Sequence, residues 1–240
     1  MARLARLSIG GYPHLVVQRS DARPIVSDGV ESARLLVLLR EAAAAAKVAL
    51  HGYALLPQAA WLVATPADGV GLGRLMQAVG RRYVRWVNQR RGGAGSLFGG
   101  RYRAALLEPE TMFLDALRYV EARPVTCGVV EWPQDYAWSS YRHHVGLASD
   151  PAIEDHPVYW ALGNTPFDRQ AAYRARAQQP LSSAVADGFE RALRGGWVVG
   201  SPEFVRRISL SCPRRPVRAQ PGRPRRRSPT ESSKPAHWDE

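Results

Sequence analysis

The chain has 240 residues, of which 45% are hydrophobic, and a formal net charge of +12. This length accommodates one domain with a tail or two small domains, and the apolar content suffices for a folded core. Such a charge favours an anionic partner, nucleic acid before an acidic membrane surface, although an arginine-rich coding bias would also raise it. The two cysteines, Cys127 and Cys212, form no CxxC pair, which argues against a zinc site or a disulfide framework.

Nothing in the sequence indicates secretion or membrane insertion. Residues 1–10 lack the long apolar run and the small-residue cleavage site of a signal peptide. The most apolar segment, Leu35–Leu50, contains Arg40, Glu41 and Lys47, so it predicts a soluble helix rather than a membrane span. Together with the unpaired cysteines, these features favour a cytoplasmic protein without a membrane partner.

The hydrophobic pattern predicts alternating strands and helices along the first 123 residues. The predicted elements, in chain order, are a strand over His14–Arg19, a helix over Val30–Lys47, strands over Leu50–Leu56 and Ala60–Thr65, a helix over Leu72–Arg90, a strand over Arg101–Leu107, and a helix that Pro109 opens and that ends near Arg123. This order predicts an α+β fold, a ferredoxin-like split βαβ sandwich with helices on one face of an antiparallel sheet.

The remaining sequence predicts a helical extension and a basic tail. Helices are expected over Pro166–Gln178 and Ser182–Arg194. Residues after Leu210 are rich in Pro, Arg and Ser, with eight basic residues against three acidic ones, which predicts a disordered, phosphate-binding tail. The expected organisation is therefore a ferredoxin-like domain over residues 1–150, a helical extension over 151–209 and the tail over 210–240.

One group of arginines suggests a nucleic-acid surface. It lies at the end of the helix over Leu72–Arg90 and on the strand that follows, with Trp86 and Tyr102 interleaved, and comprises Arg81, Arg82, Arg85, Arg90, Arg91, Arg101 and Arg103. Arginines follow phosphates while aromatic rings stack on unpaired bases, a combination that suits single strands and hairpins. The alternative is a solvated helix end whose cations complement the helix dipole.

Several short segments, in shared order and spacing, resemble the REP-associated tyrosine transposases over about residues 10–208. They are Leu50–Pro57 (LHGYALLP), Gly99–Tyr102 (GGRY), Arg118–Val125 (RYVEARPV), Trp138–Arg142 (WSSYR), Leu162–Pro166 (LGNTP) and Arg194–Trp197 (RGGW). The resemblance implies the ferredoxin-like fold and the cleavage and rejoining of single-stranded DNA, often at a hairpin from a REP element. In this family a tyrosine forms a covalent phosphotyrosine, and a divalent metal such as Mg²⁺ or Mn²⁺ polarises the scissile phosphate.

Tyr119 stands at the position of the family's nucleophile. At 100° per residue it lies about 150° from the centre of the apolar stripe formed by Phe113, Leu117 and Val120, so some exposure is expected. The alternative is a surface tyrosine without function, or one packed beneath the C-terminal segment. Because the pKa of a phenol is about 10, the nucleophile needs a nearby base or a metal.

The metal site of the family is where this sequence departs from the pattern. The family's His-hydrophobic-His motif aligns with Ala59-Ala60-Trp61, and its third ligand, four residues after the tyrosine, aligns with Arg123. Alanine offers no lone pair and an indole nitrogen only donates, so no metal cofactor is expected here. A guanidinium at Arg123 suits a phosphate instead. The histidines at 14, 51, 143, 144, 156 and 237 show no second motif with ligand spacing.

These observations predict a transposase-like protein that binds single-stranded or hairpin DNA through Arg123 and the arginine group, with Tyr119 catalytic only if activity survives. One alternative is an active tyrosine transposase that transfers DNA strands through Tyr119. Another is an RNA-binding module that reuses the same basic surface. Since related transposases act as dimers or monomers, a homodimer is one of the expected states.

Overall fold

A computed structural model describes residues 6–212 and 215–217 of the chain. Its first six elements follow the predicted order: β1 (His14–Arg19), α1 (Gly29–Ala46), β2 (Val48–Leu56), β3 (Ala59–Pro66), α2 (Gly71–Arg91) and β4 (Arg103–Leu107). The strands form one sheet in the order β2-β3-β1-β4-β5, in which the three pairs among the first four strands are antiparallel. The predicted α+β class and the split βαβ arrangement are confirmed.

A fifth strand, β5 (Val198–Val199), changes the character of the sheet. It pairs with β4 in parallel, with Leu106 opposite Val198, so the sheet is mixed rather than purely antiparallel. Two residues have no measurable alternation of apolar and polar side chains, and the sequence pattern therefore could not identify them as a strand.

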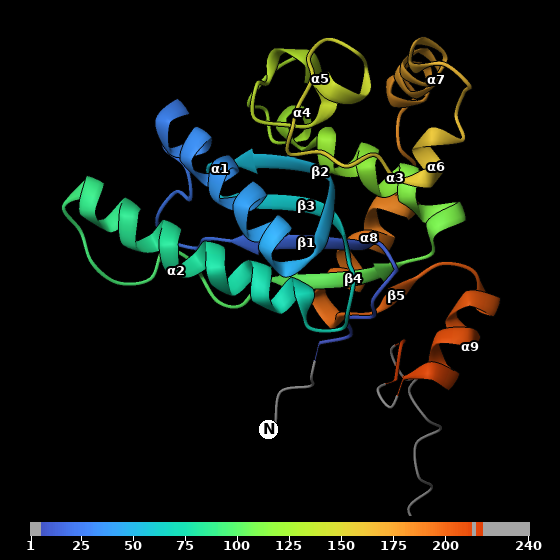
Figure 1. Ribbon diagram of the computed structural model, residues 1–240, viewed down its shortest axis with the longest axis horizontal. Helices are drawn as coiled ribbons and strands as arrows, with labels where there is room; N and C mark the ends of the chain where they lie inside the picture. The colour runs from blue at the N-terminus through green and yellow to red at the C-terminus, as the bar shows by residue number, and fades with distance from the viewer. Residues whose placement is uncertain (1–5, 213–214, 218–240) are drawn as a thin grey trace, which may run out of the picture.

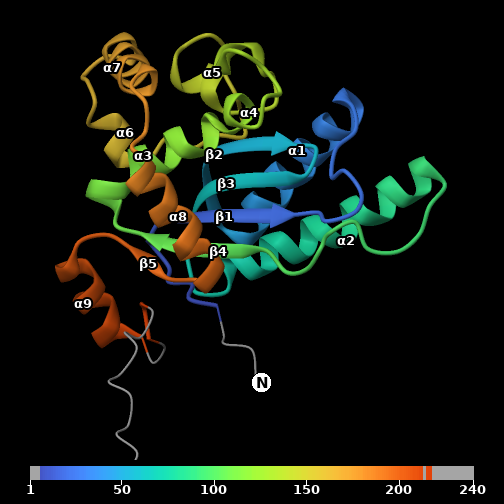
Figure 2. The ribbon, with the colours of Figure 1, turned by 180° about the vertical axis from the view of Figure 1, so that it is seen from behind.

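Both faces of the sheet are covered by helices, and the prediction of helices on one face only is wrong. In Figure 1, α1 and α2 lie across one face; in Figure 2, seen from behind, α3 (Pro109–Glu121) and α8 (Ser183–Gly195) lie across the other. The reason is visible in β1, where Leu15, Val16 and Val17 are all buried: Val16 packs with α1 and α2, whereas Leu15 and Val17 pack with α3 and α8.

Local chemistry explains where the main helices begin and end. Asp28 caps α1 by accepting a hydrogen bond from the backbone N–H of Glu31, and Lys47 ends that helix in the left-handed conformation. Gly92 ends α2 in the same way. The helix opened by Pro109 ends at Glu121, and a separate short helix, α4 (Arg123–Thr126), follows after Ala122. Pro124 lies in the first turn of α4, where the missing backbone N–H of proline is tolerated.

The second half of the chain adds short helices around the sheet: η1 (Pro133–Asp135), α5 (Tyr141–His144), α6 (Pro157–Trp160), α7 (Pro166–Gln178) and α9 (Pro202–Ser211). The two helices predicted in this region are confirmed as α7 and α8. The predicted disordered tail falls mainly on residues 213–214 and 218–240, which lie outside the described ranges. Within those ranges no helix combines the length and apolarity needed to cross a membrane.

A buried carboxylate ties α3 to α5 and α7. Glu121, at the end of α3, is 1% exposed, and its side chain accepts three hydrogen bonds. Oε1 accepts from Ser140 Oγ at 2.5 Å and from His144 Nδ1 at 2.7 Å, while Oε2 accepts from the Tyr173 hydroxyl at 2.6 Å. A carboxylate buried this deeply is tolerated only because its oxygens are satisfied by these donors.

We expect Glu121→Gln to lower the free energy of unfolding by about 3 kcal/mol, because the amide places a donating NH₂ group among hydroxyl and imidazole donors. Tyr173→Phe, which removes one of the three donors, should cost about half as much. Urea unfolding measures both. The exposed Glu131→Gln is the matched control and should stay within about 0.5 kcal/mol of the parent chain. A Glu121→Gln variant as stable as that control would refute the role of this network.

Candidate functional site

The structure buries Tyr119, so the exposure expected from its helical position is wrong. Only 3% of the residue is accessible, and its ring packs edge-on against Trp61 and beside Phe189 of α8, at centroid distances of 5.6 Å and 5.1 Å. The apolar stripe of α3 predicted burial on one side of that helix only. In the structure, α8 packs against the other side, which carries Tyr119. The alternative of a tyrosine packed beneath the C-terminal segment is the observed arrangement.

The hydroxyl of Tyr119 is bound within the protein. It donates to Glu190 Oε1 at 2.6 Å, and Arg19 pairs with the same carboxylate at 3.1 Å. Glu190 is 71 positions from Tyr119 and comes from another helix, so no local motif links the two. Sequence analysis therefore missed both Glu190 and Arg19 as members of this site.

The positions aligned with the family's metal ligands do lie beside the tyrosine. Trp61 is 3% exposed on β3, and Ala59 lies two residues earlier on the same strand, hence on the same face. The Arg123 guanidinium lies over the Tyr119 ring at 3.9 Å and 4.8 Å from the Trp61 ring centre. A buried indole and a cation fill the volume where an ion would need lone pairs, so these residues do not fit a divalent metal.

The electrostatics of the pair oppose nucleophilic chemistry. Burial first, and then the hydrogen bond to Glu190, raise the pKa of the Tyr119 phenol, against the opposing charge of Arg123. For Glu190, burial raises the pKa, but the Tyr119 hydrogen bond and the charges of Arg19 and Arg123 outweigh it and lower the value overall. A carboxylate with a lowered pKa is a weak base toward a phenol whose pKa is raised, so Tyr119 keeps its proton.

Part of the predicted arginine group is engaged in ion pairs. Arg82 pairs with Glu41 at 2.6 Å, and Arg90 pairs with Asp28 at 2.8 Å and with Glu31. Arg91 also pairs with Glu31, which is 1% exposed. These contacts arise because α2 packs along α1, with its end beside the start of α1. They partly neutralise the charges expected to face nucleic acid.

The other predicted arginines divide between two places. Arg81 and Arg85 are exposed on α2. Arg101 and Arg103 line a cleft of about 560 Å³, and Arg6, Arg19 and Arg194 line it as well. Tyr102, expected to stack on a base, is 9% exposed and carries the Arg6 guanidinium over its ring at 3.8 Å. Three of the cleft arginines were not singled out from the sequence, because they come from distant segments.

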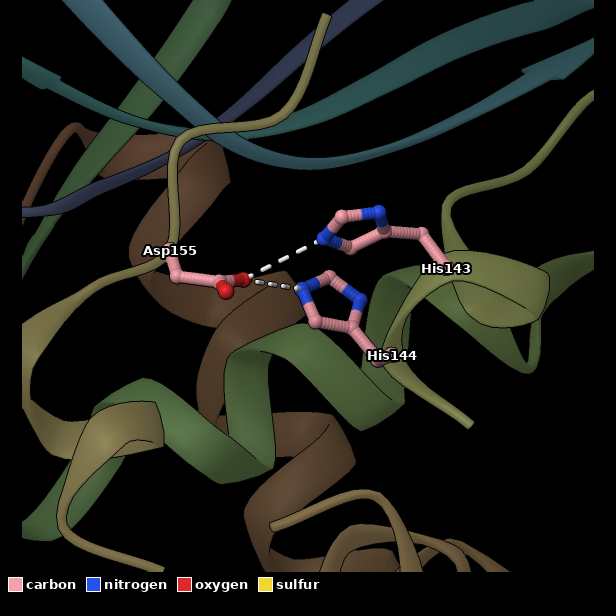
Figure 3. A group of neighbouring side chains, drawn as sticks. All are labelled: His143, His144 and Asp155. Carbon is pink, nitrogen blue, oxygen red and sulfur yellow. Dashed lines mark hydrogen bonds and ion pairs between the residues drawn. The ribbon is translucent and has the colours of Figure 1, made fainter. Parts of the chain in front are cut away.

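The fold also assembles His143, His144 and Asp155, as Figure 3 shows, with possible ligand atoms all within 4.8 Å of one another. Their hydrogen bonds assign different roles to the two rings. His144 Nδ1 donates to Glu121, which leaves Nε2 with a lone pair; His143 Nδ1 accepts from the Asp150 backbone N–H at 3.1 Å, so its Nε2 carries a proton toward Asp155 at 3.3 Å. In this arrangement His143 is a donor to Asp155 and offers no lone pair to a metal at that atom.

The contribution of Glu190 to stability should depend on pH. Because its pKa is lowered in the folded chain, its stabilisation is present above its ordinary value of 4.5 and is lost as pH falls through the lower folded value. We expect Glu190→Gln to cost about 1 kcal/mol near neutral pH. The cost should stay constant down to about pH 5 and shrink below it, as measured by thermal unfolding across that range. A cost that grows on acidification would contradict this assignment; Glu131→Gln serves as the control.

The fold is similar to that of a solved transposase structure. The structure of a REP-associated tyrosine transposase bound to a REP hairpin matches with a TM-score of 0.51 and 13% sequence identity, over 66% of this chain and 93% of that chain. A chain from Deinococcus radiodurans described as a transposase matches at 16% identity over 51% of this chain and 95% of its own, but its TM-score of 0.33 carries no argument. No family model and no curated protein sequence matches the chain. The expected resemblance is thus confirmed at the level of fold: this chain has the fold of a REP-associated tyrosine transposase.

Proposed function

We propose that the protein binds hairpin or single-stranded DNA as a transposase-like protein whose cleavage chemistry has lapsed. The observation that carries this proposal is the closed tyrosine site, in which the Tyr119 hydroxyl donates to Glu190 and its ring is enclosed by Trp61, Phe189 and Arg123. A phosphate would have to displace these contacts before it could meet the hydroxyl. It would then meet no metal, since Trp61 and Arg123 supply no ligand atoms.

The DNA-binding part rests on charge and on the fold. The chain carries a net charge of +12, and the similar solved structure is bound to a REP hairpin. Arg81, Arg85, Arg101 and Arg103 are exposed, and no acidic partner contacts them within the described ranges. We assign the action to the cytoplasm, where Cys127 and Cys212 would persist as the free thiols that they are here.

One observation favours a second candidate, an active tyrosine transposase. Glu190 is already hydrogen-bonded to the Tyr119 hydroxyl, which is the position of a general base. Activity would require Glu190 to lose its ion pair with Arg19 while it keeps the hydrogen bond to Tyr119, so that the pKa of its carboxyl group rises.

A labelled DNA hairpin with single-stranded flanks, incubated with the full chain and Mg²⁺ or Mn²⁺ at two salt concentrations, tests the proposal. We expect a salt-sensitive shift on a native gel and no covalent adduct on a denaturing gel. Tyr119→Phe should bind as tightly as the parent chain, because the lost hydrogen bond is internal to the protein. An adduct that disappears in Tyr119→Phe would instead establish an active transposase, and tighter binding to an RNA hairpin of the same sequence would favour the RNA-binding alternative.

The predicted surface on α2 has its own test. Arg81→Gln/Arg85→Gln should weaken hairpin binding about tenfold and reduce the slope of log affinity against log salt by about 2, since two phosphate contacts are lost. Arg40→Gln/Arg191→Gln removes the same charge from exposed positions elsewhere, on α1 and α8, and is the matched control. Equal losses in the two double variants would mean that net charge, rather than this surface, drives binding.

A further inference from the structure

The arginine-lined cleft joins two glycine-rich segments that are far apart in the sequence. Gly99-Gly100 precedes β4, whereas Gly195 is the last residue of α8 and Gly196 follows it. Both pairs line the cleft, each beside an arginine and an aromatic residue. The first segment leads into β4, and the second lies at the C-terminal end of α8. The tertiary fold thus brings the GGRY and RGGW segments together around one opening.

The glycines are required by the shape of this cleft. Gly100 and Gly196 have φ angles of 148° and 65°, which side chains rarely adopt. A Cβ at Gly99 would overlap the Asp21 carboxylate, and one at Gly195 would overlap the Trp197 indole. The cleft wall is therefore bare backbone at four positions, which permits close approach by a ligand.

The lining is strongly positive. Arg6, Arg19, Arg101, Arg103 and Arg194 line the cleft, and Asp21 is the acidic residue among the described lining residues. Arg19 is held by Glu190 and Arg6 by the Tyr102 ring. The side chains of Arg101, Arg103 and Arg194 are exposed and make no hydrogen bond or ion pair with described residues. Arg194 also offsets the partial negative charge at the end of α8. Three guanidinium groups around one concave opening leave a positive potential that an anion would neutralise.

The cleft adjoins the tyrosine site on the same face of the sheet. In the strand register Trp61 on β3 lies opposite Val17 on β1, and Val17 lies opposite Arg103 on β4. These three neighbouring residues connect the tyrosine site with the cleft. On α8, Glu190 contacts Tyr119 and Arg194 lines the cleft, and four residues separate them, which is one helical turn. A strand bound in the cleft would thus lead toward the closed Tyr119.

We propose that this cleft binds the sugar-phosphate backbone of a single-stranded DNA segment, with Arg101, Arg103 and Arg194 as its phosphate contacts. The inference rests on the proposed function and identifies the part of the DNA that this site takes. Arg101 precedes β4 and Arg103 is its first residue, and both line the cleft, so they can contact successive parts of one bound strand. A duplex presents a convex surface to the protein, whereas a single strand can enter a concave cleft between a strand and a helix end.

The test compares two double variants of the full chain by fluorescence anisotropy with a labelled oligothymidylate and with a blunt hairpin lacking flanks. Arg103→Gln/Arg194→Gln removes one arginine from each wall, and Arg40→Gln/Arg191→Gln is the control with equal charge. Arg19 is left unchanged because it also holds Glu190. We expect the cleft variant to bind oligothymidylate about tenfold more weakly, with its salt slope reduced by about 1.4. Its affinity for the blunt hairpin should match that of the control, and thermal unfolding should show that both variants are folded.

The outcomes separate this inference from the proposed function. If the parent chain binds neither DNA, the proposed function and the cleft assignment both fail. If the parent chain binds DNA and the cleft variant binds oligothymidylate as tightly as the control does, only the cleft assignment fails. Equal competition by thymidine monophosphate and by unlabelled oligothymidylate would also overturn it, because the cleft would then be a site for a free nucleotide.

Discussion

Apolar residues on both faces of the sheet impose the main constraint on this protein. Leu15, Val16 and Val17 follow one another on the central strand β1, and all three are buried, so neither face can be left to solvent. On one face α1 and α2 provide the cover that any split βαβ fold supplies. On the other, α3 alone is too narrow, and α8 from the C-terminal region completes the layer (Figure 2). The burial of apolar surface is thus the reason that the C-terminal region lies on the sheet.

The state of Tyr119 follows from that packing. Once α8 lies on the sheet, Phe189 and Glu190 approach the tyrosine from the side opposite α3. The aligned ligand positions hold an indole and a guanidinium, which pack with the phenol where an ion would repel Arg123. The carboxylate of Glu190 then partly offsets the charges of Arg19 and Arg123 beside a protonated phenol. The result is a closed cluster in which the Tyr119 hydroxyl and the Glu190 carboxylate satisfy each other.

Arg19 is the residue common to the closed cluster and the open cleft. Its guanidinium pairs with Glu190, lies 5.2 Å from the Trp61 ring centre and lines the cleft. Arginine suits this position, because its planar cation can stack on an aromatic ring and still donate to a carboxylate.

Elsewhere, the carboxylate of Glu121 accepts hydrogen bonds from Ser140, His144 and Tyr173, and so anchors α5 and α7 to α3 on the side of that helix away from Tyr119.

The sequence by itself determined the elements whose signals are local. Periodicity and proline positions were sufficient for β1, for α2 with its stripe of buried side chains, and for α7. Residue chemistry alone was enough to show that Ala59, Trp61 and Arg123 cannot bind a metal. Only the tertiary structure decided that Tyr119 is buried, that Glu190 holds its hydroxyl, and that two glycine-rich segments form one cleft. These features depend on which helix covers the second face of the sheet, and contacts between residues 71 or more positions apart leave no periodic signal in a single sequence.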